Sequence, residues 1–414
     1  MKQITLEAWG DKSVELDPQE ADALARMELV RVLIDKPPNT WRLLADSRIG
    51  VAWHEDWELR VSPRLAIPRL MFLLGYAADP RGWRAAVAPF GADQDLFSAI
   101  ASGFAFHAKR AISPTPIRGY ITVEDRDVTL RGRLRFADQI ARWPGLPIPL
   151  ELSYDDYTAD IAENQMLRGA TELLLRFPRV PVLARKRLLG IRAALQDVLA
   201  AAPRPDVKCP TITRLNSRYR AALALAELIL RGSSITSAGG RVKSVSFVFD
   251  MNKVFEDFIS SALRSSLERL GGQVRLQYGQ ERLDVQRRIR LIPDISWWSG
   301  SQCRAVVDAK YKRLHDDRFP NADAYQMLGY CTALGLSRGY LVYAKNAGEA
   351  DRSHLIRNTN IDLEIKTVNV EDEPDVLLAN VDRLAADIAA AARVPKSFSP
   401  PTLGGIAVTA CGVM

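Results

Sequence analysis

The sequence predicts an α+β region at residues 1–149, a helical segment at 150–241 and a mixed α/β domain at 242–394. Strand-like and helix-like runs share the first region, helical periodicity dominates the second, and helices alternate with apolar strand-like runs in the third. The length of 414 residues is enough for two or three domains. The tail at 395–414 is expected to be poorly ordered.

The N-terminal region combines two periodicities. Apolar and polar residues alternate as in half-buried strands at 3–9 and 119–136, and apolar residues recur at helical spacing at 19–34 and 64–77. Prolines and glycines gather at 113–120 and 142–150, where they indicate loops or strand edges. The mixture predicts an α+β domain.

The middle segment is expected to contain three helices, at 153–177, 184–202 and 216–232. In the first of these, acids stand near the start and the apolar residues fall mostly on one side, as in an amphipathic helix. The stretch at 232–241, GSSITSAGGR, is small and polar and predicts a loop or domain boundary.

The third region begins with a helix at 249–270, which the pair Gly271–Gly272 ends. Two apolar strand-like runs follow at 287–298 and 303–312, on either side of the short connection SGSQ. The later elements are a helix at 322–336, strands at 338–344 and 361–370, and a helix at 375–394. This succession predicts a mixed central sheet.

Two aspartates and a lysine interrupt the two strand-like runs. Asp294 lies in the first run, Asp308 lies in the second directly after two valines, and Lys310 follows two residues later. Because side chains alternate along a strand, Asp308 and Lys310 point to the same face. Asp294 reaches the same pocket if the register of the two strands allows it.

This set of residues suits a divalent metal. The carboxylates of Asp294 and Asp308 and the backbone carbonyl of Ala309 are the oxygen ligands that Mg²⁺ prefers, with Mn²⁺ as the alternative. A bound metal lowers the pKa of its water and neutralises charge on a phosphate. Lys310 could orient or deprotonate the attacking water, or stabilise the charge that develops on phosphorus.

Each half of this motif is weak by itself. Acid-x-Lys occurs also at 206–208 and 364–366, and Pro-Asp occurs also at 205–206 and 374–375. Only Asp294 and the triplet 308–310 lie on consecutive apolar runs with a short connection. The alternative is a surface hairpin in which Asp294 caps a turn and Asp308 pairs with Lys310 or an arginine.

Two further polar residues are candidates for the same pocket. Glu256 lies between apolar pairs on the helix that precedes the strands, and Gln326 lies on the helix that follows them. Each is an ordinary solvated helix residue in the alternative interpretation. The basic run at 310–318 is either a contact for a DNA backbone or a solvated loop.

The overall composition limits the class of protein. A net charge of +7 and a pI of about 9.2 favour contact with a polyanion without requiring it. Four scattered cysteines without a CxxC pair argue against a zinc site or a disulfide framework. No uninterrupted apolar stretch of membrane-spanning length and no signal-type N-terminus occur, so we expect a cytoplasmic protein without membrane contact.

The quoted residues resemble two known groups of proteins. Pro293–Asp294 with the triplet 308–310 resembles the PD-(D/E)xK motif of restriction and repair nucleases. Four stretches resemble the McrC family, the nuclease subunit of the McrBC 5-methylcytosine restriction system: 113–121, 130–140, 163–170 and, most specifically, FVFDMNKVFEDFI at 247–259. The resemblance extends from about residue 105 to 345.

The resemblance implies a restriction-endonuclease-like fold for the third region, with Asp294, Asp308 and Lys310 as the catalytic core and Glu256 and Gln326 as supports. It also implies that the chain cuts double-stranded DNA in phage defence and that its N-terminal region docks to a McrB-type AAA+ GTPase hexamer and stimulates it. The sequence has no GxxxxGK[ST] phosphate-binding loop, so GTP would be used by that partner.

Two other functions stay open at this stage. A non-catalytic adaptor would only activate the GTPase ring, and metal-dependent nicking of DNA separates it from a nuclease. A stand-alone repair nuclease would cut without nucleotide or partner, although the long N-terminal half contains no recognisable DNA-binding motif.

Overall fold

The computed structural model describes residues 2–393, apart from 37–38, 55–56, 79, 81–94, 146–147, 205, 239–240, 312–320 and 345–350. The tail at 395–414 and nearly all of the basic run at 310–318 therefore lie outside the described residues. Contacts divide the chain into two units, Met1–Val254 and Phe255–Met414. This division falls beyond the expected boundary at 241, because the strand at Arg241–Asp250 pairs with the N-terminal sheet.

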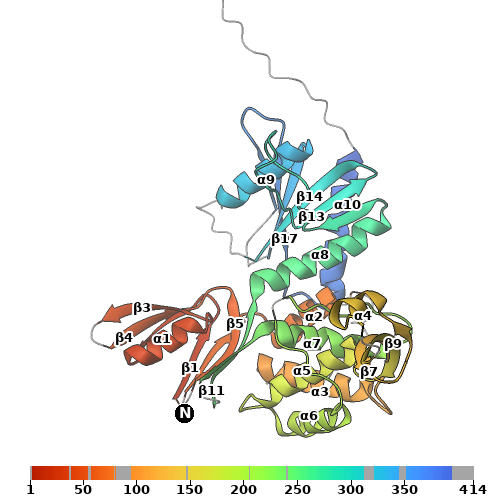
Figure 1. Ribbon diagram of the computed structural model, residues 1–414. Coiled ribbons are helices and arrows are strands. Elements are labelled where there is room, and N and C mark those ends of the chain that lie inside the picture. Colours follow the sequence, from red (N-terminus) through yellow and green to blue (C-terminus); the bar gives the residue numbers. More distant parts are fainter. Residues whose placement is uncertain are drawn as a thin grey trace, which may run out of the picture. The chain divides into compact units, whose positions relative to one another are not determined.

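The main sheet of the first unit has five strands, which Figure 1 shows in red and green. In spatial order they are β1 (Lys2–Glu7), β6 (Trp57–Ser62), β5 (Arg48–His54), β11 (Arg241–Asp250) and β10 (Ser233–Ala238). Only β1 and β6 run parallel; the other neighbours are antiparallel. In the polar stretch at 232–241, expected as a loop, residues 233–238 form β10, because they pair antiparallel with β11, which is itself held in the sheet by β5.

A small sheet lies beside the N-terminus, with the order β2 (Asp11–Glu15), β4 (Thr40–Leu44) and β3 (Arg31–Lys36). Helix α1 (Pro18–Arg26) begins at a capping box, in which Asp17 and Glu20 each accept a hydrogen bond from the other's backbone N–H. The helix expected over 19–34 is therefore wrong beyond Arg26, because the β-branched and aliphatic residues that follow pair with β4 instead.

A third sheet joins β7 (Gly119–Asp127), β9 (Leu150–Thr158) and β8 (Arg133–Leu134), with α4 (Phe136–Arg142) against β9. The helix expected to begin at Ser153 begins only at Ala162, because residues 153–158 pair with β7 along their whole length. Tyr120 and Tyr157 form a cross-strand aromatic pair there, with ring centroids 5.0 Å apart.

A group of helices completes the first unit: α2 (Ile67–Ala78), α3 (Leu96–Ala111), α5 (Ala162–Leu175), α6 (Val182–Ala194) and α7 (Arg220–Gly232). Helix α7 contacts α2, α3, α5 and β11, so that the leucines and isoleucine of its inner side are fully buried. Burial of this apolar surface is the main stabilising term for the helical part of the unit.

The second unit is built on a six-stranded sheet with the spatial order β12 (Gln273–Leu276), β13 (Ile295–Ser299), β14 (Gln302–Lys310), β15 (Arg338–Ala344), β17 (Asp362–Val368) and β16 (Arg352–Leu355). β14, β15 and β17 run parallel, and the other pairs are antiparallel. The predicted mixed α/β architecture is confirmed. The first strand-like run at 287–298 is wrong in its first half, because regular pairing with β14 begins only at Ile295.

Three helices accompany this sheet: α8 (Met251–Arg269), α9 (Asn321–Leu334) and α10 (Pro374–Arg393). α9 packs on the side chains of Val306, Leu341 and Ile365, and Figure 1 shows α10 on the other side of the strands. The stretch Ala305–Ala309 of β14 is buried without alternation, as in a strand covered on both faces. None of the helices among the described residues is long and apolar enough to cross a membrane.

Candidate active site

The pairing of β13 with β14 brings the two predicted aspartates together. Ile295 pairs with Val307, so Asp294 at the end of β13 lies opposite Asp308. Asp294 Oδ2 accepts a hydrogen bond of 3.0 Å from the backbone N–H of Ala309. Lys310 Nζ lies 2.7 Å from Asp308 Oδ2 in an ion pair. The structure thus places Asp294, Asp308 and Lys310 in one cluster, as expected, and excludes the exposed hairpin because Asp308 is only 1% exposed.

Burial dominates the electrostatics of this cluster. Desolvation, together with the nearby charges of Asp308 and Glu256, raises the pKa of Asp294 to about 7, although the Ala309 N–H and Lys310 oppose the rise. Desolvation also raises the pKa of Asp308, although Lys310 opposes it. Burial by itself lowers the pKa of Lys310, but the carboxylates of Asp308 and Asp294 outweigh it, so the pKa of the ammonium is raised. One positive charge therefore stands against two carboxyl groups, of which Asp308 is buried and Asp294 is half-buried.

The donor set fits a hard divalent cation. Asp308 is buried, and the Lys310 ammonium lies 2.7 Å from its Oδ2. No group of three or more His, Cys, Asp and Glu side chains among the described residues is placed to hold a metal. Two carboxylates with a nearby carbonyl suit Mg²⁺, which keeps several of its waters. A metal contact through the Ala309 carbonyl stays a prediction.

Glu256 on α8 is joined to the cluster through a residue that the sequence did not single out. Its Oε1 accepts a hydrogen bond of 2.8 Å from Gln277 Nε2, and the Gln277 backbone N–H donates to the Asp294 carbonyl at 2.9 Å. Gln277 has a positive φ of 46° and makes both hydrogen bonds in this conformation, the first with its side chain and the second with its backbone N–H. Glu256 is half-buried, and its charge is one of the causes that raise the pKa of Asp294.

Gln326 on α9 has a more distant connection. Its side chain is exposed, and its Nε2 donates to the Tyr330 hydroxyl at 2.9 Å. Tyr330 in turn donates to the Ile292 carbonyl at 2.9 Å, two residues before Asp294. The described hydrogen bonds of Gln326 therefore reach the loop before Asp294 rather than its carboxylate.

A third buried acid accompanies the cluster. Asp323 in the first turn of α9 is 4% exposed, and its Oδ2 accepts a hydrogen bond of 2.8 Å from the Tyr343 hydroxyl. Its charge contributes to the raised pKa values of Asp308 and Lys310. The sequence offered no signal for Asp323, because an acid in the first turn of a helix is common for reasons of helix stability alone.

The two tryptophans between the acids are packing residues. Trp297 and Trp298 are both buried. Trp297 Nε1 donates to the Gly271 carbonyl at 2.8 Å, and Trp298 Nε1 donates to Ser296 Oγ at 2.9 Å. Each indole thus has an apolar environment and a partner for its N–H.

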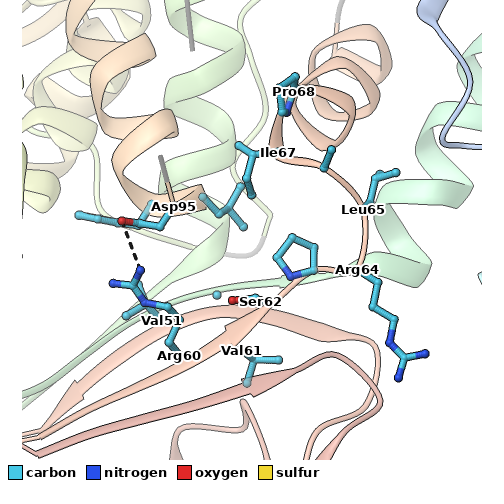
Figure 2. A pocket seen from close by; sticks show the side chains of 14 residues that line it. Val51, Arg60, Val61, Ser62, Arg64, Leu65, Ile67, Pro68 and Asp95 are labelled. Atoms are coloured by element: carbon cyan, nitrogen blue, oxygen red, sulfur yellow. Dashed lines mark ion pairs between the residues drawn. The ribbon is translucent and has the colours of Figure 1, made fainter. Parts of the chain in front are cut away.

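A cavity of about 640 Å³ lies in the first unit, away from this cluster in the sequence (Figure 2). Its wall is formed by the end of β6, the turn into α2 and the start of α3. Arg60 and Asp95 form an ion pair of 3.4 Å across part of it, and the rest of the lining is largely apolar. Asp95 is the one acid among the described residues that line this cavity, and these residues include no lysine.

Comparison with known proteins agrees with the architecture. A chain in the refined half-complex from a tetradecameric assembly of Thermococcus gammatolerans McrB AAA+ hexamers with bound McrC is 18% identical, with a TM-score of 0.56 over 94% of this chain and 100% of that chain. A chain in the cryo-EM structure of the Thermococcus gammatolerans McrBC complex is 19% identical over 64% of this chain and 88% of that chain, with a TM-score of 0.36. The first match shows a shared fold; the second is too weak to add to it.

No curated protein sequence matches the chain. A family model described as McrBC 5-methylcytosine restriction system component matches residues 44–344, which is more than half of the chain. This span includes the predicted acids and lysine together with most of the first unit. The expected resemblance to McrC is therefore confirmed, and the chain belongs to the McrBC 5-methylcytosine restriction system component family.

Proposed function

We propose that this chain is the Mg²⁺-dependent DNA endonuclease subunit of a McrBC-type restriction system and that it acts on double-stranded DNA in the cytoplasm. The observation that carries the proposal is the buried cluster of Asp294, Asp308 and Lys310, in which two carboxyl groups face one ammonium. A structural ion pair would not need the second buried carboxyl group. A site for a divalent cation and a phosphodiester does need it.

The fold around the cluster supports assignment to the PD-(D/E)xK nucleases. Asp294 directly precedes β13, the 308–310 triplet ends the neighbouring strand β14 of a mixed sheet, and helices accompany the sheet. Family membership adds a context in which DNA is the target.

Asp294 and Asp308 would hold Mg²⁺, which when bound activates water and neutralises charge on the phosphate. The carboxylates of Asp308 and Asp294 raise the pKa of Lys310 in the metal-free protein, so its ammonium is the positive charge of the cluster. Its ammonium, held 2.7 Å from Asp308, would orient the attacking water and stabilise the charge that develops on the phosphoryl oxygens. Gln277 would keep Asp294 in place, because its backbone N–H donates to the Asp294 carbonyl while Glu256 holds its side chain.

The energy and the target choice would come from a partner. The similar structure carries McrB AAA+ hexamers with bound McrC, and we propose that this chain likewise binds a McrB-type AAA+ GTPase hexamer and stimulates its GTP hydrolysis. The absence of a GxxxxGK[ST] loop from the sequence supports a division of labour in which GTP is used by the partner.

The decisive test uses the full chain with a McrB-type partner, GTP, Mg²⁺ and methylated DNA. Asp308→Ala and Lys310→Ala are expected to abolish cleavage while assembly and partner GTP hydrolysis persist. Cleavage at the wild-type rate by the Asp308→Ala chain would contradict the proposal. GTPase stimulation by a wild-type chain that never nicks DNA would assign it to a non-catalytic activator instead.

A further inference from the structure

The segment between β12 and Asp294 forms a small hairpin rich in arginine, residues 281–291, here called the arginine hairpin. Its two arms are bridged at Arg282 and Arg290, and hydrogen bonds join Leu283 N–H to the Ile289 carbonyl at 3.0 Å and Leu291 N–H to the Glu281 carbonyl at 3.2 Å. These hydrogen bonds make the segment a defined structural element. It belongs neither to the six-stranded sheet nor to the proposed metal site.

The tip of the hairpin is closed by Asp284. Its Oδ1 accepts the backbone N–H groups of Arg288 at 2.9 Å and Ile289 at 2.7 Å, and its carbonyl accepts that of Arg287 at 3.0 Å. These backbone hydrogen bonds lower the pKa of Asp284. The acid is therefore committed to the turn, and the arginines are carried on a preorganised loop.

The hairpin has two different faces. Opposed residues of an antiparallel pair project on the same side, so Arg282 and Arg290 share one face while Leu283 and Ile289 share the other. The inner part of the apolar face packs on α9, where Leu291 is buried with Tyr330. Leu283 lies about 4.0 Å from where a side chain on Gly329 would begin but is 42% exposed, and Ile289 is 52% exposed. The face that carries Arg290 consequently points away from the helix.

The basic face is not neutralised by acids. Segment 281–290 contains four arginines and two acids. Arg282 donates at 2.8 Å to the carbonyls of Gly279 and Glu281, and thus braces the base of the hairpin. Arg288 and Arg290 are exposed, and no ion pair or side-chain hydrogen bond joins either of them to the described residues, although the Arg290 guanidinium lies against Gly279. Exposed guanidinium groups on a rigid loop are suited to bind phosphate oxygens.

The hairpin also stands next to the proposed catalytic site. Arg290 and Asp294 are four residues apart, so their Cα atoms are separated by at most about 14 Å even in an extended chain. Along a duplex, that distance corresponds to about four base pairs, since each strand carries one phosphate per 3.4 Å of helix axis. Tyr330 holds the Ile292 carbonyl between them and so fixes the connection.

We propose that the arginine hairpin binds the phosphate backbone of duplex DNA beside the scissile phosphate, mainly through Arg288 and Arg290. The inference rests on the proposed nuclease function, and goes beyond it by assigning a substrate-positioning element outside the metal motif. Because it contacts phosphates, the hairpin contributes affinity and placement of the duplex without sequence preference.

The test measures binding of a short fluorescent duplex by the full chain in EDTA, which prevents cleavage, over a series of salt concentrations. The double variant Arg288→Ala/Arg290→Ala should bind about tenfold more weakly per arginine at 0.1 M salt, and the slope of log K against log salt should fall by about 2. The loss should be equal for methylated and unmethylated duplexes. Arg288→Lys/Arg290→Lys should retain most of the binding, because it keeps both charges.

Arg357→Ala is the matched control, since Arg357 is also exposed but follows β16 at the opposite edge of the same sheet. If the double variant binds DNA with the affinity and salt slope of the wild type, and the wild-type chain binds and cuts DNA, the hairpin proposal alone is overturned. Unchanged DNA binding with loss of assembly on a McrB-type partner would overturn it in favour of a protein-docking role. A wild-type chain that neither binds nor cuts DNA would overturn the proposed function as well.

Discussion

The two units each bury acidic side chains, and they treat these acids in opposite ways. In the first unit, Glu151 is 2% exposed and lies 3.0 Å from both the Arg126 and Arg142 guanidinium groups, with the Trp143 indole N–H at 3.1 Å. Burial by itself raises its pKa, but these donors outweigh it and hold the pKa below its usual range. In the second unit, Asp294 and Asp308 share one lysine, and burial raises both pKa values.

This difference separates a structural acid from a functional one. A buried carboxylate surrounded by cations and N–H donors is satisfied by the protein alone, and it ties together the elements that supply the donors. A buried pair with too few donors leaves the protein with a cost that a bound cation removes. Glu151 and Asp308 are buried to a similar degree, at 2% and 1% exposed, so the number of partners decides whether such an acid maintains the fold or forms a site.

The largest expected effect concerns cleavage and the buried acid Asp308 of the second unit. Asp308→Asn removes one of the two carboxylates that share Lys310 and should reduce Mg²⁺-dependent cleavage at least about 1,000-fold, since one electrostatic contact in an active site contributes factors of that order. The melting temperature in EDTA should not decrease, because the substitution removes a buried charge. A cleavage assay and a thermal melt of the same preparation test both statements. A melting temperature lowered by several degrees would show that Asp308 stabilises the fold, as Glu151 does.

The next effect is a pH dependence of stability in the absence of metal. The pKa of Asp294 is about 7 in the folded protein, against an ordinary value of 3.8, so the folded state binds more protons between these two pH values. Stability should therefore decrease as the pH rises from about 4 to about 7, more for the wild type than for Asp294→Asn. Denaturant unfolding in EDTA measures it, and saturating Mg²⁺ should remove most of the decrease. Identical pH profiles for the two chains would contradict the raised pKa.

The converse substitution tests the structural acid. Glu151→Gln leaves Arg126 and Arg142 without their carboxylate and should lower the melting temperature by several degrees at neutral pH. Catalysis per folded molecule should not change, because Glu151 belongs to the first unit. Thermal melts and cleavage rates at a temperature below the transition check both statements. An unchanged melt would show that the donors around Glu151 do not stabilise the fold.

The smallest effect concerns Gln326. Its side chain is exposed and reaches the loop before Asp294 only through Tyr330, so Gln326→Ala should change the cleavage rate by less than about tenfold. Glu256→Gln should have the larger effect of the two, since Glu256 contacts Gln277 and adds its charge to the field at Asp294. Single-turnover cleavage rates of the two variants, measured side by side, rank the two effects. A larger loss for Gln326→Ala than for Glu256→Gln would indicate that Gln326 contacts the reacting atoms.

Local pattern predicted much of the second unit because its elements carry strong signals. The helix expected at 249–270 is α8, and the strand expected at 338–344 is β15. Local pattern failed where a long-range partner decided the conformation. Residues 153–158 carry acids that suggest a helix start, yet β7 pairs with them along their length. The small polar stretch at 233–238 forms a strand because it pairs with β11, which a distant strand, β5, holds in the sheet.

The sequence by itself determined which chemical groups are available: Asp294, Asp308 and Lys310 stand on two consecutive apolar runs, and their spacing places Asp308 and Lys310 on one face. The tertiary structure decided that Asp294 reaches the Ala309 amide, that Gln277 and Asp323 join the cluster, and that the arginine hairpin packs on α9. The physical reason is that alternation within a strand is local, whereas strand register, burial and the resulting pKa depend on contacts between residues far apart in the chain.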